Sequence, residues 1–360
     1  MILTVILAFF SLIGLVTLHE LGHFIAAKRF GVRVEEFGIG YPPRIIGKKI
    51  GKTLYSLNLL PFGAFVKMPG EIEHLEDSAS FFKKPIWQRM LIVLAGVISF
   101  WIVAAILFSI VVGLGAPTVI SDDETLGIVN PKVQIIGVAK DSPAAQAKLR
   151  VGDNIIEVKS QDSGMQKIDK VKNLQNFAKA NLGQDLTVTI ERGKDNFQVS
   201  LSARANPPSG EGPLGIALVR VATKIYPWWQ APWRGVLATV NMTEGVILGY
   251  AGAIKNIIKG VPSGVELTGP VGIVSMFSQA SKLGADYFLQ FVGMVAVYVA
   301  IFNILPIPSV DGGKILFLII EAARRKPISQ KVEQNVTSVF FGLLILLMIF
   351  VTIKDVIKLF

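Results

Sequence analysis

The sequence contains no cysteine. This absence excludes disulfide bonds, thiolate metal ligands and a cysteine nucleophile. Histidine is almost as scarce, with three residues among 360, and charged residues make up only 17% of the chain. A site that needs imidazole groups has very few residues to draw on, so the position of each histidine is informative.

Long hydrophobic runs take the place of the missing charge. Apolar residues make up 51% of the chain and the mean hydropathy is +0.54, which is typical of a membrane protein. Four segments are long and apolar enough to cross a bilayer, at about residues 1–27, 88–115, 286–305 and 335–353. Residues 1–18 lack the basic start and the small-residue cleavage site of a signal peptide, so we expect a retained first span.

The net charge of +10 does not form a single basic patch. Basic residues alternate along the chain with the apolar spans, which indicates membrane topology and contact with anionic headgroups and argues against a nucleic-acid partner. No Lys or Arg precedes the first span, whereas the loops after the first and third spans are rich in both. The positive-inside rule then predicts that these loops are cytoplasmic and that the N-terminus, the central soluble region and the C-terminus lie outside.

The region between the second and third spans is expected to form one small α/β domain, from about residue 127 to 218. Short β-rich stretches occur at 133–138, 154–158, 186–190 and 197–201, and a helix-like stretch at 171–181 precedes the third of them. The run SPAAQAKLRVGDNIIEV, residues 142–158, resembles part of a PDZ domain. That resemblance implies a closing strand at PLGI, residues 213–216, and binding of an extended peptide at an open edge. An unrelated small mixed domain is the alternative.

Three tryptophans open the stretch from residue 226 to 260. Tryptophan favours headgroup depth, and the moderate amphipathic periodicity that follows fits either a pair of interfacial helices or a short fifth span. Arg234, Glu244 and Lys255 favour a segment that lies on the membrane. We therefore expect four parts: 1–115 and 266–360 as two membrane halves, 116–225 as the external domain and 226–265 as interfacial helices.

The motif HELGH, residues 19–23, stands near the cytoplasmic end of the first span. Positions i and i+4 share one helix face, so His19 and His23 can present two nitrogens to one metal ion. Neutral imidazoles suit zinc, which in catalytic sites takes three protein ligands. Glu20, one step round the helix, is placed to accept a proton from a water that the metal activates. The alternative, a histidine pair at a helix end beside a basic loop, leaves polar groups at membrane depth without compensation.

The third ligand is expected to be a carboxylate. The remaining histidine, His74, stands among acidic residues and is predicted to be a solvated loop residue. Asp311 follows the third span in YVAIFNILPIPSVDGG, where prolines and glycines break the helix at the inner boundary. Asp311 would thus lie on the same side of the membrane as His19 and His23. The alternative for Asp311 is an N-cap of the following helix.

The order of these motifs resembles the site-2 protease family of intramembrane zinc metalloproteases, in its bacterial RseP-like branch. The resemblance is carried by HELGH, by the pattern N-x-x-P-x-P-x-x-D-G at residues 303–312 and by the intervening PDZ-like domain. The stretches at 60–71, 83–96 and 267–273 add to it.

The resemblance implies that His19, His23 and Asp311 hold zinc and that Glu20 is the general base. It also implies that Asn303, Pro306 and Pro308 lie beside the substrate and hold its backbone. Residues 37–68 would form a membrane-associated β-structure that pairs with an unwound substrate strand, although a basic cytoplasmic hairpin held by headgroups is an alternative.

The chain departs from the family pattern at the start of the second span. The family often has AGPxxN there, whereas this chain reads AGVISF, with Val97 and Ser99 at the usual Pro and Asn positions. Val310 stands where Leu is commoner. These departures concern the surroundings of the site and leave the three metal ligands unchanged.

The function implied by the resemblance is regulated intramembrane proteolysis in the bacterial inner membrane. Substrates would be single-span membrane proteins of the anti-sigma-factor or remnant-signal-peptide class. A non-catalytic PDZ-bearing scaffold is one alternative, and a metal sensor or transporter is another. The presence of Glu20 beside the histidines favours catalysis, and the spans contain no inverted repeat or chain of polar residues that would indicate a transporter.

Overall fold

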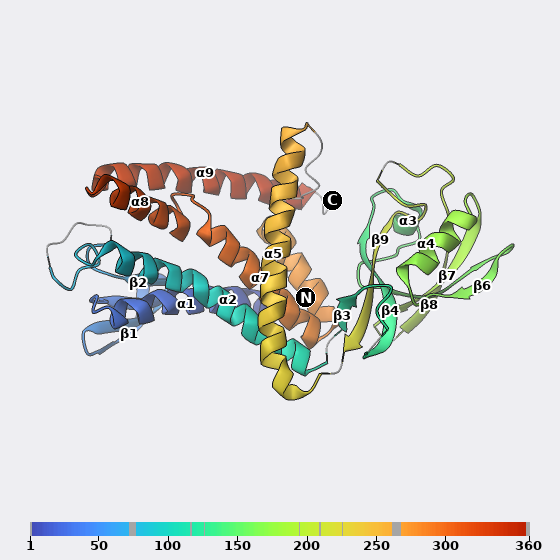
Figure 1. Cartoon of the computed structure of the whole chain (residues 1–360), viewed down its shortest axis with the longest axis horizontal. Helices are drawn as coiled ribbons and strands as arrows, with labels where there is room; N and C mark the ends of the chain where they lie inside the picture. The colour runs from blue at the N-terminus through green and yellow to red at the C-terminus, as the bar shows by residue number, and fades with distance from the viewer. Residues whose placement is uncertain are drawn as a thin grey trace. The chain divides into compact units, whose positions relative to one another are not determined.

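The computed structural model describes residues 2–71, 77–115, 117–125, 127–193, 195–208, 210–224, 226–260 and 268–357. The chain divides into two compact units, of which one comprises 1–110 with 232–360 and the other 111–231. The first unit contains the apolar helices and the second is an α/β domain (Figure 1). The predicted division into four parts, at 1–115, 116–225, 226–265 and 266–360, stays a prediction. His74 lies outside the described residues.

Four helices of the described chain are long and apolar enough to cross a membrane. They are α1 (Ile2–Arg29), α2 (Ile86–Gly113), α7 (Ala285–Ile304) and α9 (Gln330–Ile357). All four coincide with the segments expected from hydropathy. Many of the large apolar side chains on α9 are exposed, as expected of a helix surrounded by lipid. The protein is therefore a membrane protein, as the sequence predicted.

The described residues of the first unit also form the helices α5 (Ala231–Ile258), α6 (Pro270–Leu283) and α8 (Asp311–Arg324). The stretch expected to be a pair of interfacial helices or a fifth span is one continuous helix, α5, and it is not among the four candidate spans. In the helical core, Phe277 of α6 is fully buried, and its ring packs edge-on against Phe291 of α7 with 4.8 Å between ring centroids. This core joins α1, α2, α5, α6 and α7 through alanine, branched aliphatic and phenylalanine side chains.

The first unit also contains a β-sheet made by two long, bent strands, β1 (Glu36–Ile50) and β2 (Thr53–Lys67). Residues 36–39 of β1 pair on one side with 54–57 and on the other with 64–67, while 44–50 pair with 53–58. The segment 60–67 is therefore an edge of this sheet. Apolar side chains of both strands, such as Ile46 of β1 and Phe62 of β2, are exposed, which suits contact with lipid.

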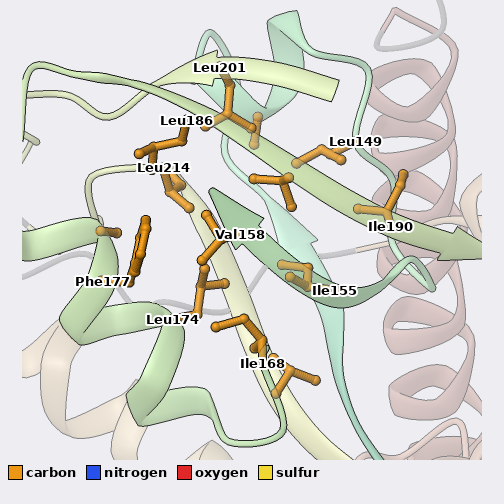
Figure 2. Packing of buried hydrophobic residues seen from close by; sticks show 14 of the residues in the cluster. Leu149, Ile155, Val158, Ile168, Leu174, Phe177, Leu186, Ile190, Leu201 and Leu214 are labelled. Atoms are coloured by element: carbon orange, nitrogen blue, oxygen red, sulfur yellow. The ribbon is translucent and has the colours of Figure 1, made fainter. Parts of the chain in front are cut away.

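The α/β domain is built on an antiparallel sheet with strand order β3-β9-β4-β5-β7-β8 and β6 paired to β5. The strands are β3 (Pro117–Ile120), β4 (Ile128–Val138), β5 (Asn154–Ser160), β6 (Gly164–Lys167), β7 (Asp185–Arg192), β8 (Asp195–Ser202) and β9 (Ile216–Lys224). Two helices, α3 (Pro143–Gln146) and α4 (Val171–Ala180), complete it. Leu174 and Phe177 of α4 pack with Val158 and Leu186 of the sheet in one apolar core (Figure 2).

Most predicted elements of this domain are present. The four β-rich stretches correspond to β4, β5, β7 and β8, the predicted helix at 171–181 is α4, and the proline-started helix α3 is capped by Ser142, whose Oγ accepts a hydrogen bond from the Ala145 N–H at 3.1 Å. The closing strand differs from the prediction, because β9 begins at Ile216 and the preceding residues form a turn. Gly215 has a φ of +72° and would bring a Cβ into the side chain of Ser142. The Gly215 N–H donates to the Gly212 carbonyl at 3.1 Å, so the chain turns at 212–215 before it enters β9.

Candidate metal centre

His19 and His23 face each other on one side of α1. Their Nε2 atoms are 3.2 Å apart, and both side chains are buried. The one-turn spacing of the motif produces this arrangement directly, because residues i and i+4 of a helix lie above one another. A carboxylate oxygen of Glu20 and one ring nitrogen of each histidine all lie within 4.8 Å of one another, so the three residues could contact one metal ion. The paired imidazoles expected from the sequence are thus formed on a single helix.

Asp311 approaches this pair from the first turn of α8. Its Oδ2 atom lies 3.2 Å from His19 Nε2 and 3.3 Å from His23 Nε2. No described residue donates a hydrogen bond to this oxygen. The three atoms form a nearly equilateral triangle, and they come from α1 near the start of the chain and from α8 near its end.

The triangle has the size that a zinc ion requires. Tetrahedral zinc with ligand bonds of about 2.0–2.1 Å places its ligand atoms about 3.3 Å apart. The three measured separations are 3.2, 3.2 and 3.3 Å. With both Nε2 atoms unprotonated, the three atoms direct lone pairs at one another, and a cation between them relieves the repulsion. The donor set and its spacing therefore fit zinc, with a fourth position left for water or substrate.

Helix α2 holds the histidine rings in place. The Nδ1 atom of His23 lies 2.9 Å from the Ile92 carbonyl oxygen, which can only accept, so Nδ1 carries the proton and Nε2 is left free to bind metal. The ring of His19 stacks on Phe100, with centroids 4.6 Å apart and an interplanar angle of 16°. A Cβ atom at Gly96 would overlap the His23 ring, and a Cβ at Gly22 would overlap the Ala95 carbonyl. The two helices pack this closely only because both positions are glycine.

The break between α7 and α8 positions Asp311, the predicted third ligand. Helix α7 ends at Ile304, and α8 begins at Asp311 itself. The alternative in which Asp311 is an N-cap is wrong, because Val310 occupies the N-cap position without a side-chain cap. A Cβ at Gly312 would overlap the Leu305 carbonyl, and one at Gly313 that of Ile307. The two glycines therefore let the connecting loop fold onto the start of α8.

The predicted substrate residues lie on this loop or next to it. Asn303 is in the last turn of α7, and its side-chain amide donates to the Val299 carbonyl at 2.9 Å. Pro306 is exposed, whereas Pro308 is buried and its carbonyl accepts a hydrogen bond from Thr337 of α9 at 3.1 Å. None of these contacts joins the three residues to the metal triad, so their part in substrate binding stays a prediction.

A cavity of about 160 Å³ opens beside the triad. Glu20, His23 and Asp311 line it on one side, and Ala64, Phe65 and Val66 of the β2 edge line it on another. Glu20 is partly buried. The cavity thus joins the proposed base, two ligands and an edge strand in one space. Such a space can hold a peptide bond together with a water molecule.

Three residues of this cavity were missed as site residues in the sequence: Tyr41, Glu71 and Lys314. Lys314 Nζ donates a hydrogen bond to Glu71 Oε1. Burial acts to lower the pKa of Lys314, but the charge of Glu71 and its hydrogen bond raise the pKa above the usual range, so Lys314 is positively charged. Burial also raises the pKa of the Tyr41 phenol, and the neighbouring Glu20 raises it further. In the sequence, only the position of Lys314, three residues after Asp311, could have indicated that it lies near the site.

The departure at the start of the second span is also visible. Ser99 Oγ donates to the Gly96 carbonyl of its own helix at 2.6 Å, and Val97 is fully buried in the helical core. The hydroxyl of Ser99 is therefore engaged with its own backbone.

Comparison with known proteins gives a consistent result over nearly the whole chain. The sequence model of peptidase family M50 matches residues 7–347. A Clostridium perfringens protein described as a zinc metalloprotease is 34% identical over 356 residues, with 98% of each chain covered. The regulator of sigma-W protease RasP of Bacillus subtilis is 27% identical, with 100% of each chain covered. The membrane metalloprotease ARASP of Arabidopsis thaliana, a chloroplast protein, is 28% identical over 96% of this chain and 77% of its own.

Among solved structures, the PDZ domain of an SdrC-like protein from Listeria monocytogenes is 22% identical. It covers 27% of this chain and 92% of its own with a TM-score of 0.21, a likeness too small to carry an argument. The family match across the spans and the HELGH motif, together with the zinc-sized triad, lead to one assignment. This chain belongs to peptidase family M50 and is a membrane zinc metalloprotease.

Proposed function

We propose that this protease cleaves peptide bonds within the transmembrane segments of single-span membrane proteins. The observation that carries the proposal is the joint position of the His19–His23–Asp311 triangle, Glu20 and the β2 edge around one cavity. The HELGH helix is itself one of the four candidate spans. A metal centre on such a helix serves substrates that lie in the membrane.

Each residue has a distinct part in the proposed reaction. His19, His23 and Asp311 hold zinc, which when bound supplies a Lewis acid and lowers the pKa of a water molecule. Glu20 accepts the proton of the attacking water and returns it to the leaving amine. The basic residues of the loops after the first and third spans support an active site on the cytoplasmic side of a bacterial inner membrane, with the N-terminus and the α/β domain outside.

The edge segment 60–67 is proposed to bind the substrate backbone. A peptide bond within a helix is shielded by its own turn, so the substrate must unwind before it reaches the metal. An edge strand offers replacement hydrogen bonds to the freed N–H and C=O groups. Ala64, Phe65 and Val66 pair with 37–39 on one side only in the described sheet, and they line the cavity beside Glu20. Asn303, Pro306 and Pro308 would hold the substrate from the loop before Asp311.

The first experiment compares wild-type protein with Glu20→Gln on a reporter transmembrane segment in liposomes. Glu20→Gln should keep its zinc and lose cleavage by a factor of about 10² or more, because the general base is removed while the ligands remain. Glu244→Gln on α5 makes the same chemical change away from the triad and should cleave like wild type. Cleavage by Glu20→Gln at the wild-type rate would contradict the role of Glu20.

The second experiment uses the absence of cysteine to map the substrate strand. Phe62 and Ile46 are both 67% exposed, and they lie on opposite edge segments of the same sheet. In a Glu20→Gln background, Phe62→Cys should form a disulfide with a cysteine placed near the cleavage position of the substrate, and Ile46→Cys should not. Equal cross-linking from both edges would contradict binding at segment 60–67.

The α/β domain is proposed to bind an extended peptide, as expected of a PDZ-like domain. Residues 216–219 of β9 pair with β4 on one side, and within the described sheet β3 pairs only with 220–223 on the other side. A cavity of about 190 Å³ between this free edge and α4 is lined by Leu174, Ala178 and Leu218. Such an edge beside an apolar groove suits strand addition. The external tails of trimmed substrates, of the anti-sigma-factor or remnant-signal-peptide class, are the proposed ligands.

Peptide binding to the domain can be tested separately from catalysis. Leu218→Arg should weaken binding of an apolar-ended peptide, because a charge then lies in the groove. Val199→Arg on β8, another partly buried strand position outside the groove, serves as the control. Equal binding by wild type and Leu218→Arg would contradict a ligand site at this edge.

A further inference from the structure

Glu71 and Lys314 lie in the cavity beside the triad but take no part in the proposed hydrolysis. Lys314 Nζ donates to Glu71 Oε1, and their side chains are 41% and 17% exposed. The two residues come from segments far apart in the sequence. Their ion pair joins the turn after β2 to the first turn of α8. It therefore connects the β1–β2 sheet, whose edge is proposed to bind substrate, with the helix that begins at Asp311.

The Glu71 end of this pair is firmly held. Glu71 follows a tight turn in which Gly70 has a φ of +78°, and a Cβ there would overlap Ser80 Oγ. The Phe81 N–H donates to the Pro69 carbonyl at 2.8 Å, which ties the turn to the segment before α2. Ser80 and Phe81 are buried. The Glu71 carboxylate is therefore presented from a packed turn.

The Lys314 side of the pair belongs to the first turn of α8. Lys314 stands three residues after Asp311, so both side chains project from the same face of the helix. Farther along α8, Glu321 receives two hydrogen bonds from Arg89 of α2, at 3.1 and 2.5 Å. Arg89 is only 6% exposed. Two charged contacts thus hold α8, one to the turn after β2 and one to α2, the helix whose Ile92 carbonyl contacts His23.

Asp311 needs such external support. Its Oδ2 atom lies within 3.3 Å of both imidazole nitrogens, and no described residue donates a hydrogen bond to it. The direction of this oxygen therefore follows from the position and rotation of the first turn of α8. A rotation of that turn by a fraction of a residue step would move the oxygen out of the triangle.

We propose that Lys314 and Glu71 are positioning residues of the metal centre. Their ion pair fixes the first turn of α8 against the end of β2, so that Asp311 completes the zinc triad and the β2 edge stays beside it. The consequence for cleavage rests on the proposed function. The consequence for zinc binding does not, and it can be measured on its own.

The test is a charge-exchange series on the full-length protein in detergent, with zinc affinity measured by chelator competition. Lys314→Glu and Glu71→Lys should each weaken zinc binding by about tenfold or more, as loss of an outer-shell partner does. The double variant restores an opposite pair and should bind zinc within about threefold of wild type, and Lys314→Arg should bind like wild type. Lys132→Glu breaks a comparable pair with Glu191 in the α/β domain, at 2.7 Å, and should leave zinc affinity unchanged.

Two results would overturn the proposal. One is a zinc affinity within about twofold of wild type for both single reversals. The other is a double variant that unfolds at the wild-type temperature and still binds zinc as weakly as the singles. Should the reversals fail to fold, Lys314→Met removes the charge and the hydrogen-bond donors but keeps a similar side-chain volume, and it must weaken zinc binding for the proposal to stand. A wild-type protein that binds zinc but cuts no transmembrane segment would contradict the proposed function, while the zinc series still decides the role of the pair.

Discussion

Gly96 of α2 faces the imidazole ring of His23 so closely that a Cβ atom at residue 96 would overlap the ring. Helices α1 and α2 therefore meet at a point where the backbone of α2 leaves room for the ring of His23. This contact gives Gly96, a residue without any functional group, a part in shaping the proposed metal centre.

Gly96→Ala should displace His23 and weaken zinc binding by about tenfold or more, because the ring must rotate away from Asp311. The measurement is chelator competition on the purified protein. Gly249→Ala on α5 is the matched control, since a Cβ there meets no atom within 4 Å. Unchanged zinc affinity in Gly96→Ala would show that α2 does not constrain the ligand.

Removal of zinc should lower the thermal stability of the helical unit and leave the α/β domain unchanged. A ligand that binds only the folded state stabilises it by about 2.7 kcal/mol at a hundred times its dissociation constant. Scanning calorimetry with and without a zinc chelator measures the effect, and His23→Ala should abolish the shift. A zinc-dependent transition that persists in the His19→Ala, His23→Ala double variant would place the metal elsewhere.

Asp355→Ala should loosen the N-terminus of α6. The Asp355 Oδ2 atom on α9 accepts hydrogen bonds from the Gly269 and Gly272 N–H groups at 2.9 and 2.8 Å, and the residue is 8% exposed. Loss of the acceptor leaves two donors unsatisfied, at a cost of about 1–3 kcal/mol. Hydrogen exchange at residues 269–272 measures the loss. Asp355→Asn keeps one acceptor oxygen and should be milder, so equal exchange in both variants would argue against a capping role.

Leu186→Ala should destabilise the α/β domain by about 2–5 kcal/mol, because it opens a cavity in the core. Leu186 is 0% exposed, whereas Leu182 in the same domain is 44% exposed. Leu182→Ala should change stability by less than about 0.5 kcal/mol. Urea unfolding followed by circular dichroism makes the comparison. Zinc affinity should stay the same in both variants, and a loss in Leu186→Ala would show that the two units do not unfold independently.

The sequence by itself determined the spans, the pair of imidazoles and most strands of the α/β domain. Hydropathy fixes a span because a helix of that length satisfies its backbone within lipid, and the i, i+4 spacing places His19 and His23 on one face without help from the rest of the fold. The break before Asp311 could also be predicted, because Pro306 and Pro308 follow the third span two residues apart and proline does not continue a helix. The boundaries of β9 and the continuity of α5 were not, because turn geometry and helix length depend on packing.

The tertiary structure alone decided which groups surround these ligands. No local pattern indicates that Gly96 must be small for His23, that Ile92 fixes its tautomer, or that Glu71 pairs with Lys314. The bent pairing of β1 and β2, which makes segment 60–67 an edge beside the cavity, is likewise absent from the alternation of the sequence. Each of these contacts joins residues far apart in the chain, and their meeting depends on how helices and strands pack, which the periodicity of a single segment does not contain.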